Sequence, residues 1–309
     1  MKTRRALVLA TRGSRLALRQ AELVIEALRA VSPEVQVETR IVRTEGDRRQ
    51  EAPLEEIGGQ GVFVKDIELR LAKGEVDVAV HSLKDMPALT PPGLIIAAVL
   101  RRGDVRDALI SRRGEGLEAL PAGARIGTDS RRRAVQLLAL RPEVEPVSIR
   151  GNVETRLRKV EAGEYDAAVL AVAGLERLGL LDRASQVFSV DELLPAVGQG
   201  ALAAECRADD ADVLALLRRV DHRETHLAVA AERAFLARLG AGCRLPVGAY
   251  AEVAGDRLRL RAMLADEAGR VQREEAEGPV SEGERLGVEL AERLLSQAAL
   301  GLAKGESAS

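Results

Sequence analysis

The sequence is short of aromatic residues, cysteines and long apolar runs, and each shortage excludes a class of protein. Tryptophan is absent and aromatic residues make up 2% of the chain, too few to build a base-stacking surface for single-stranded nucleic acid easily. Two cysteines allow at most one disulfide, which favours a reducing compartment over a disulfide-stabilised fold. The longest apolar runs, residues 94–100 and 167–173, are far too short to span a membrane.

Neither sign of charge dominates. The 46 basic and 48 acidic residues leave a formal net charge of −2, which gives no reason to expect nucleic acid or an anionic membrane as a partner. Arg12 interrupts the apolar run that begins at residue 6, too early for a secretory signal peptide. We therefore expect a cytoplasmic protein. Lysine supplies only six of the basic residues, so only arginines in a specific context are informative.

The pattern of apolar residues predicts α/β architecture. The 309 residues, 46% of them hydrophobic, are enough for two or three domains. Short apolar runs alternate with helical patterns, and several runs lack polar alternation, which is typical of largely parallel sheets covered on both faces. Strands are expected at residues 6–10, 35–42, 76–80, 94–100, 124–126, 144–149 and 167–171. Helices are expected at residues 14–30, 62–72, 131–140, 153–162, 209–220 and 224–239.

The C-terminal part has a different pattern. Residues 247–253 and 257–265 predict an antiparallel hairpin around Ala254-Gly255-Asp256, with a covering helix at 282–297. We therefore expect two α/β domains and a small α+β domain. The expected boundaries are 1–100 with 198–220 for the first domain, 101–197 for the second and 221–309 for the third.

Three predicted strand-to-helix turns carry arginine: residues 11–14, 127–133 and 150–156. A helix N-terminus offers free N–H groups and the positive end of a dipole, so each turn is a candidate anion site. In an open α/β fold such turns converge on one cleft, which predicts a ligand with many carboxylates or phosphates. Capped helices with solvated arginines are the alternative at each single turn.

The segment His81-Ser82-Leu83-Lys84-Asp85-Met86-Pro87 follows a predicted buried strand. Its polar side chains are expected on a loop facing the same cleft, since Pro87 stops any helix. Asp85 would be a poor anion ligand among arginines, but it suits a cationic group or an N–H donor. A structural Lys84–Asp85 ion pair is the alternative.

The two cysteines differ in context. Cys243 lies between Gly242 and Arg244, in an open glycine-containing loop where a thiolate would be accessible, although a packing role stays open. Cys206 has the surroundings of a packing cysteine. His222 and His226 lie one helical turn apart, but without the spacing of a zinc protease motif we expect no metal site.

Six segments together resemble the porphobilinogen deaminase family: residues 10–18, 81–87, 150–152, 170–175, 195–200 and the loop around Cys243. The resemblance covers nearly the whole chain. It implies two α/β domains like those of type II periplasmic binding proteins around a cleft, plus a small α+β domain. It also implies a transferase of porphyrin and haem biosynthesis that condenses four porphobilinogen molecules, with loss of ammonia, into the linear tetrapyrrole hydroxymethylbilane.

The resemblance also implies roles for individual residues. A dipyrromethane cofactor would be attached to Cys243, and Asp85 would be the catalytic carboxylate. The other expected cofactor-binding residues are Lys84, Thr128, Ser130, Arg132 and Arg133. The expected substrate-binding residues are Arg12, Ser14, Gln20, Phe63, Ser82, Arg150, Arg156, Arg177 and Gln199.

The chain departs from the family pattern at a few positions. Glu56 and Gln60 stand where many relatives have lysines in the loop before Phe63. Asp129 replaces a neutral residue beside the expected cofactor-binding arginines. A monomer is expected. The alternatives are a two-lobed polycarboxylate receptor without chemistry, which leaves Asp85 and Cys243 unexplained, and a regulatory protein with such a ligand domain, for which no helix-turn-helix segment is present.

Overall fold

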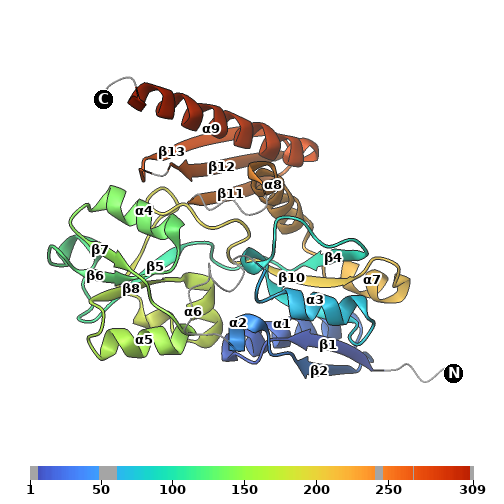
Figure 1. Ribbon diagram of the computed structural model, residues 1–309. Coiled ribbons are helices and arrows are strands. Elements are labelled where there is room, and N and C mark those ends of the chain that lie inside the picture. Colours follow the sequence, from blue (N-terminus) through green and yellow to red (C-terminus); the bar gives the residue numbers. More distant parts are fainter. Residues whose placement is uncertain (1–5, 49–60, 241–245, 267, 307–309) are drawn as a thin grey trace. The chain divides into compact units, whose positions relative to one another are not determined.

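The computed structural model describes residues 6–48, 61–240, 246–266 and 268–306 (Figure 1). The chain divides into two compact units, Met1–Gly103 with Gly200–His226 and Asp104–Gln199 with Leu227–Ser309. The finer division into three domains stays a prediction. None of the described helices is both long enough and apolar enough to cross a membrane.

The first unit is built on a five-stranded sheet with the order β2-β1-β3-β10-β4. Its strands are β1 (Leu7–Thr11), β2 (Val37–Ile41), β3 (Val78–Ser82), β4 (Leu94–Val99) and β10 (Leu202–Arg207). Its helices are α1 (Arg15–Val31), α2 (Glu45–Arg48), α3 (Lys65–Ala72) and α7 (Ala211–Arg218), with a 3-10 turn, η1 (Leu83–Asp85), directly after β3. Side chains of α1 and α7 pack on one face of the sheet, and those of α3 pack on the other.

Helix α1 shows why the local sequence folds as it does. Ala17, Ala21, Val24 and Leu28 recur every three or four residues and form its buried stripe. Ser14 caps the helix, since its hydroxyl accepts a hydrogen bond from the N–H of Ala17 at 3.2 Å. This confirms the predicted N-cap and holds the turn that carries Arg12 at the carboxyl end of β1.

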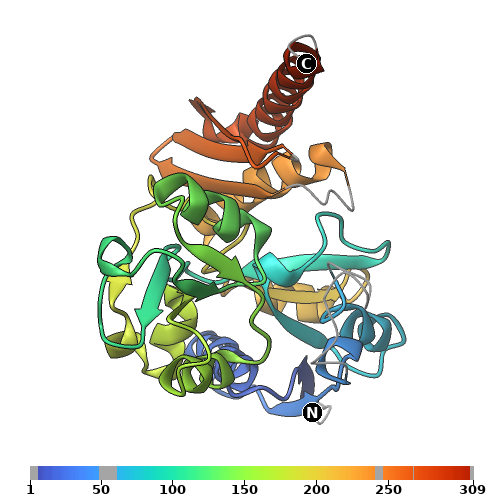
Figure 2. The same ribbon diagram turned by 60° about the vertical axis from the view of Figure 1, so that its left-hand side comes forward.

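The second unit contains a second five-stranded sheet, with the order β7-β6-β8-β5-β9. Its strands are β5 (Asp107–Ser111), β6 (Arg125–Gly127), β7 (Glu145–Val147), β8 (Ala167–Ala171) and β9 (Gln186–Val187). Helix α4 (Arg131–Leu140) covers one face, while α5 (Val153–Glu161) and α6 (Val172–Leu178) cover the other. The short turns η2 (Leu117–Ala119) and η3 (Leu181–Arg183) complete the connections. Figure 2 shows each sheet with its own helices from a second direction.

Each sheet has four strands that run in one direction and a fifth that runs against them. The opposed strands are β10 in the first sheet and β5 in the second. Both are fully buried along nearly their whole length, so their apolar pattern reads the same in either direction. The largely parallel α/β architecture is confirmed, but neither opposed strand was predicted.

The remainder of the second unit is an antiparallel sheet, β11 (Val247–Ala254), β12 (Arg257–Ala265) and β13 (Val271–Pro279), with helices α8 (Arg223–Leu239) and α9 (Gly283–Glu306). The short turn η4 (Val280–Glu282) precedes α9. The predicted hairpin is confirmed in register, with Arg257 opposite Ala254 and Gly255 at a positive φ of 64° in the turn. Strand β13 was not predicted. Five of its nine residues have charged or amide side chains, which obscure the alternation of apolar and polar residues typical of a strand.

Gly287 lets α8 and α9 approach closely. A Cβ at this position would overlap the carbonyl oxygen of Ala231 and lie 2.9 Å from the backbone nitrogen of Phe235, whose ring is fully buried. The obstructing atoms belong to a helix backbone and cannot rotate away. Glycine is therefore required by the helix contact even though it weakens α9 locally.

We expect Gly287→Ala to lower the free energy of unfolding by at least about 2 kcal/mol, because overpacking outweighs the gain of about 1 kcal/mol in helix propensity. Urea denaturation measures this difference. Ser296→Ala, at an exposed position of the same helix, is the control and is expected to change stability by no more than about 0.5 kcal/mol. Equal stability of the two variants would contradict the close contact.

Candidate active site

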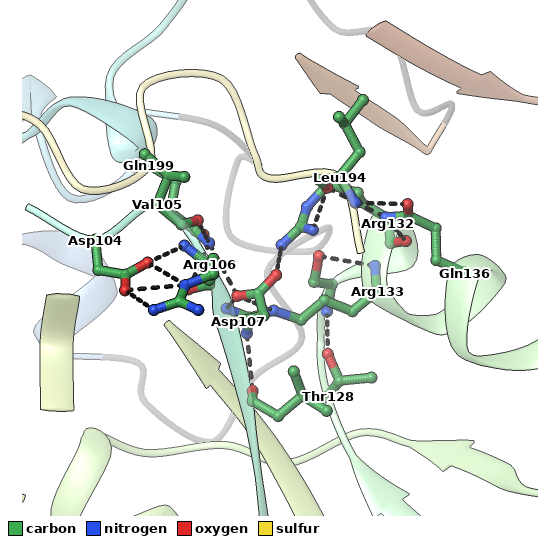
Figure 3. A network of polar contacts seen from close by, with 12 residues as sticks. Asp104, Val105, Arg106, Asp107, Thr128, Arg132, Arg133, Gln136, Leu194 and Gln199 are labelled. Atoms are coloured by element: carbon green, nitrogen blue, oxygen red, sulfur yellow. Dashed lines mark hydrogen bonds and ion pairs between the residues drawn. The ribbon is translucent and has the colours of Figure 1, made fainter. Parts of the chain in front are cut away.

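A buried carboxylate holds two of the three arginines in the first turn of α4 (Figure 3). Asp107, at the start of β5, is fully buried, and Arg132 and Arg133 are only 4% and 6% exposed. Oδ2 of Asp107 accepts a hydrogen bond from Nη2 of Arg132 at 2.7 Å, and Oδ1 accepts one from Nη2 of Arg133 at 2.6 Å. Nε2 of Gln199 donates to the same Oδ1 at 2.9 Å. We call these four residues the Asp107 cluster.

Backbone carbonyl groups fix the remaining edges of both guanidinium groups. Nη1 of Arg132 donates to the carbonyl of Leu194 at 2.6 Å, and Nη1 of Arg133 donates to that of Val169 at 2.9 Å. The side chain of Gln136 in turn holds Leu194. Its Oε1 accepts from the N–H of Leu194 at 2.8 Å, and its Nε2 donates to the carbonyl of Leu194 at 3.2 Å. Because two strands and a loop supply these partners, neither guanidinium can rotate independently.

The cluster carries a surplus of positive charge. Two guanidinium groups face one carboxylate, and burial lowers the pKa of Arg132 although Asp107 opposes the shift. Nε of Arg132 is buried and has no hydrogen-bond partner within the described part of the chain. A buried cation with an unused donor is costly unless an anion approaches it. The cluster is therefore chemically suited to a carboxylate-bearing ligand.

Two predicted cofactor residues belong to the turn before α4. Ser130 caps the helix, with its hydroxyl accepting from the N–H of Arg133 at 3.4 Å, and Thr128 accepts from the N–H of Ser130 at 3.1 Å. These bonds fix the backbone from which Arg132 and Arg133 project. Sequence-based reasoning thus identified the turn and both arginines, but it did not predict that Asp107 would hold them.

Asp129 contacts the expected substrate-binding arginines. Its Oδ2 lies 3.4 Å from Nη1 of Arg150 and 3.6 Å from Nη2 of Arg156, and its Oδ1 accepts from Ser148 at 2.6 Å. Asp129 is thus next in sequence to the expected cofactor-binding arginines, but its carboxylate contacts the segment after β7 and helix α5. Asp107 is the acid that holds Arg132.

Arg177 lies near the end of α6, and burial lowers its pKa to about 10, opposed by the neighbouring Glu176. Its guanidinium remains charged at neutral pH but has lost much of its hydration. Such a group interacts with a carboxylate more strongly than a fully solvated arginine does. This environment supports, for Arg177, the anion-binding role implied by the sequence.

In the first unit, Arg12 is held by a carboxylate and an aromatic ring. Nη2 and Nε of Arg12 donate to Oδ1 of Asp47 at 2.5 and 3.1 Å. The ring of Phe63 stacks on the same guanidinium, 4.0 Å from its central carbon. The structure thus brings two expected substrate-binding residues, Arg12 and Phe63, into direct contact. It also pairs Arg12 with Asp47, an aspartate that sequence-based reasoning missed.

Gln20 and Ser82 also meet. Nε2 of the buried Gln20 donates to Oγ of Ser82 at 2.8 Å, which joins α1 to the end of β3. One residue earlier, the buried His81 lies 3.2 Å from Oε2 of Glu205 on β10. The end of β3 is thereby anchored on both sides just before the residues expected to act in catalysis.

Lys84 and Asp85 form the end of the short turn η1, which the N–H of Leu83 ties to the carbonyl of Ala201 at 3.1 Å. Asp85 is half-buried, yet its carboxylate makes no hydrogen bond or ion pair with any described residue. The alternative of a structural Lys84–Asp85 ion pair is therefore not observed. A carboxylate in this position remains available to a cationic or N–H-bearing ligand.

The cysteine predictions have different outcomes. Cys206 is fully buried on β10, and burial raises its pKa to about 11, which confirms a packing cysteine. Cys243 and Arg244 lie outside the described residues, as do Glu56 and Gln60. Nδ1 of His226 contacts Asp221 at 2.8 Å, and no group of metal-binding side chains occurs among the described residues.

The fold and these arginine groups define an α/β protein with arginine-bearing strand-to-helix turns. A family model described as "Porphobilinogen deaminase, dipyromethane cofactor binding domain" matches residues 7–215, and "Porphobilinogen deaminase, C-terminal domain" matches residues 226–296. The chain belongs to the porphobilinogen deaminase family, whose members are transferases that carry a dipyrromethane cofactor.

Relatives agree over nearly the full length. Porphobilinogen deaminase of Roseiflexus sp. (strain RS-1) is 48% identical over 98% of this chain and 100% of its own. That of Desulforudis audaxviator is 50% identical over 96% of both chains. Solved structures match more weakly: a YaeC-family lipoprotein from Enterococcus faecalis has a TM-score of 0.42 and 12% identity, covering 71% of this chain and 93% of its own. A periplasmic binding protein from Salmonella typhimurium has a TM-score of 0.39 and 12% identity, covering 72% and 94%.

We expect Asp107→Asn to lower the free energy of unfolding by about 3–5 kcal/mol, because two buried guanidinium groups lose their carboxylate. Urea denaturation measures this. Asp104→Asn is the matched control, since Asp104 pairs with the more exposed Arg106 at 2.6 Å and such a pair contributes no more than about 1 kcal/mol. If both variants unfold at the same urea concentration, Asp107 does not hold the arginines.

Proposed function

We propose that the protein condenses four porphobilinogen molecules, with loss of ammonia at each step, into hydroxymethylbilane on a dipyrromethane cofactor attached to Cys243. Family membership supports the reaction. The structural observation on which the proposal chiefly depends is the buried surplus of positive charge in the Asp107 cluster, which lies within the part matched by the cofactor-binding model.

The described residues fit such a cofactor. The unused Nε of Arg132 is a buried cationic donor suited to one of its carboxylates. The residues proposed to hold the cofactor are Lys84, Asp85, Thr128, Ser130, Arg132 and Arg133. When bound, the dipyrromethane supplies the pyrrole ring to which incoming rings are joined.

The substrate also brings carboxylates, two on each ring, so a lengthening chain needs many cationic donors. We assign this role to Arg12, Arg150, Arg156 and Arg177, with Ser14, Gln20, Phe63, Ser82 and Gln199 as further binding residues. Gln199 supports the site indirectly, because its amide donates to Asp107 and to the carbonyl of Val105 at 2.8 Å. Each charge-assisted hydrogen bond contributes roughly 1.5–3 kcal/mol.

Asp85 is proposed as the catalytic carboxylate. Loss of ammonia leaves positive charge on the substrate ring, and a half-buried carboxylate without a competing partner stabilises that charge. At a separation of about 4 Å and an effective dielectric constant near ~20, the attraction is of order 4 kcal/mol. If it acts only in the transition state, it accelerates the reaction by about a thousandfold.

The proposal includes a cytoplasmic monomer that acts on a small molecule, without nucleic acid or membrane as a partner. The net charge of −2 gives no reason to expect nucleic acid or an anionic membrane as a partner. A non-catalytic polycarboxylate receptor would need the same arginines. Such a receptor would have no use for the carboxylate of Asp85, which has no partner among the described residues. It would also leave unexplained why the chain resembles porphobilinogen deaminases over its full length.

We expect the purified protein to be heavier than its sequence by two pyrrole units, as measured by intact-mass spectrometry. Cys243→Ser should have the bare polypeptide mass, whereas Cys206→Ser should retain the extra mass because its sulfur is buried in the core. A bare mass for the wild-type protein would refute the proposed cofactor. Loss of the extra mass only in Cys206→Ser would identify the other thiol as the attachment site.

Asp85→Asn should keep the cofactor but lose turnover by about a thousandfold, because the amide cannot stabilise the developing charge. Steady-state formation of hydroxymethylbilane measures this, with intact mass as the check on the cofactor. Asp182→Asn changes an exposed acid of another short 3-10 turn and should leave turnover unchanged. Near-normal turnover of Asp85→Asn would remove Asp85 from its role.

A further inference from the structure

One edge of the Arg12 guanidinium is fully engaged by Asp47. Nε lies 3.1 and 3.3 Å from the two carboxylate oxygens, and Nη2 lies 2.5 Å from Oδ1. The side chains are 26% and 17% exposed, so solvent only partly screens the pair. A two-point contact of this kind fixes the plane of the guanidinium as well as its position.

Asp47 is itself held in place by Thr44. The hydroxyl and the N–H of Thr44 donate to Oδ2 of Asp47 at 2.8 and 3.2 Å, while Oγ1 of Thr44 accepts from the N–H of Asp47 at 3.3 Å. These reciprocal bonds form a capping box at the start of α2. Burial raises the pKa of Asp47, but the contacts with Arg12 and Thr44 outweigh it and hold the pKa below its usual value. The carboxylate therefore stays ionised and aimed at Arg12.

Phe63 fixes one face of the same guanidinium and depends on Gly46 to do so. Its ring lies 4.0 Å from the central carbon of Arg12, which adds a cation–π attraction. The ring also lies close to Gly46 of α2, where a Cβ would overlap ring atoms. Gly46 thus leaves room for the ring beside the helix backbone while the ring stacks on the arginine.

The remaining edge of Arg12 is oriented but unused. Nη1 makes no hydrogen bond within the described part of the chain. We infer that Asp47 is a positioning residue for substrate binding: with Phe63 it holds Arg12 so that Nη1 and the outer N–H of Nη2 present a preformed fork to a carboxylate of porphobilinogen. This inference rests on the proposed function. A preformed fork binds more tightly because less side-chain freedom is lost on binding.

The test is a double-mutant cycle on the full-length protein, with KM for porphobilinogen and kcat measured separately. Arg12→Gln should raise KM by roughly ten- to a hundredfold through loss of a charge-assisted contact. Asp47→Asn should raise KM by about tenfold with kcat changed by less than about threefold. In the Arg12→Gln background, Asp47→Asn should have no further effect, because Asp47 acts only through Arg12.

Two further variants separate positioning from folding. Gly46→Ala, which displaces Phe63, should raise KM in the same way. Glu22→Gln, which removes an exposed pair with Arg19 on α1, should change neither constant, and melting temperatures check that every variant folds. An unchanged KM in Asp47→Asn, a fall confined to kcat, or full additivity with Arg12→Gln would overturn the inference. Failure of the wild-type protein to consume porphobilinogen would instead refute the proposed function.

Discussion

The constraint on which the site depends is that guanidinium groups cannot be buried without an acid. Arg132 and Arg133 sit inside the second unit because Asp107, fully buried between them, accepts hydrogen bonds from both. The same carboxylate accepts a hydrogen bond from Gln199. Asp107, at the start of β5, therefore links the first turn of α4 to the segment after β9. Two guanidinium groups share this one carboxylate, so the cluster keeps a surplus of positive charge, which is the basis of the proposed cofactor binding.

A similar principle recurs at the other arginines implicated in binding. Arg12 is paired with Asp47 in the first unit, and Arg150 and Arg156 share Asp129 in the second. An aspartate beside each arginine group lowers the cost of removing it from water and restricts its direction. Pairing of this kind is possible because the chain has 48 acidic residues beside its 46 basic ones.

Asp85 stands apart from these structural aspartates because the described residues offer it no cation. Anchoring bonds on both sides of β3, from Gln20 to Ser82 and from His81 to Glu205, fix the strand that leads to it. A carboxylate held on a firm strand end but left without a partner can respond to charge that arises during a reaction. The absence of a partner among the described residues thus distinguishes Asp85, the proposed catalytic carboxylate, from the aspartates that are paired with arginines.

The sequence by itself determined most of the helices and strands, the arginine-bearing turns and the family, because these depend on local periodicity, capping residues and short motifs such as residues 81–87. Only the tertiary structure decided which aspartate forms an ion pair with which arginine. Asp107 lies 25 residues from Arg132 and Asp47 lies 35 from Arg12, and no local pattern links partners that far apart. Strands β5 and β10 were not predicted. Their direction also could not be read from the sequence, because a strand buried on both faces has the same apolar pattern in either direction and only its neighbours decide how it pairs.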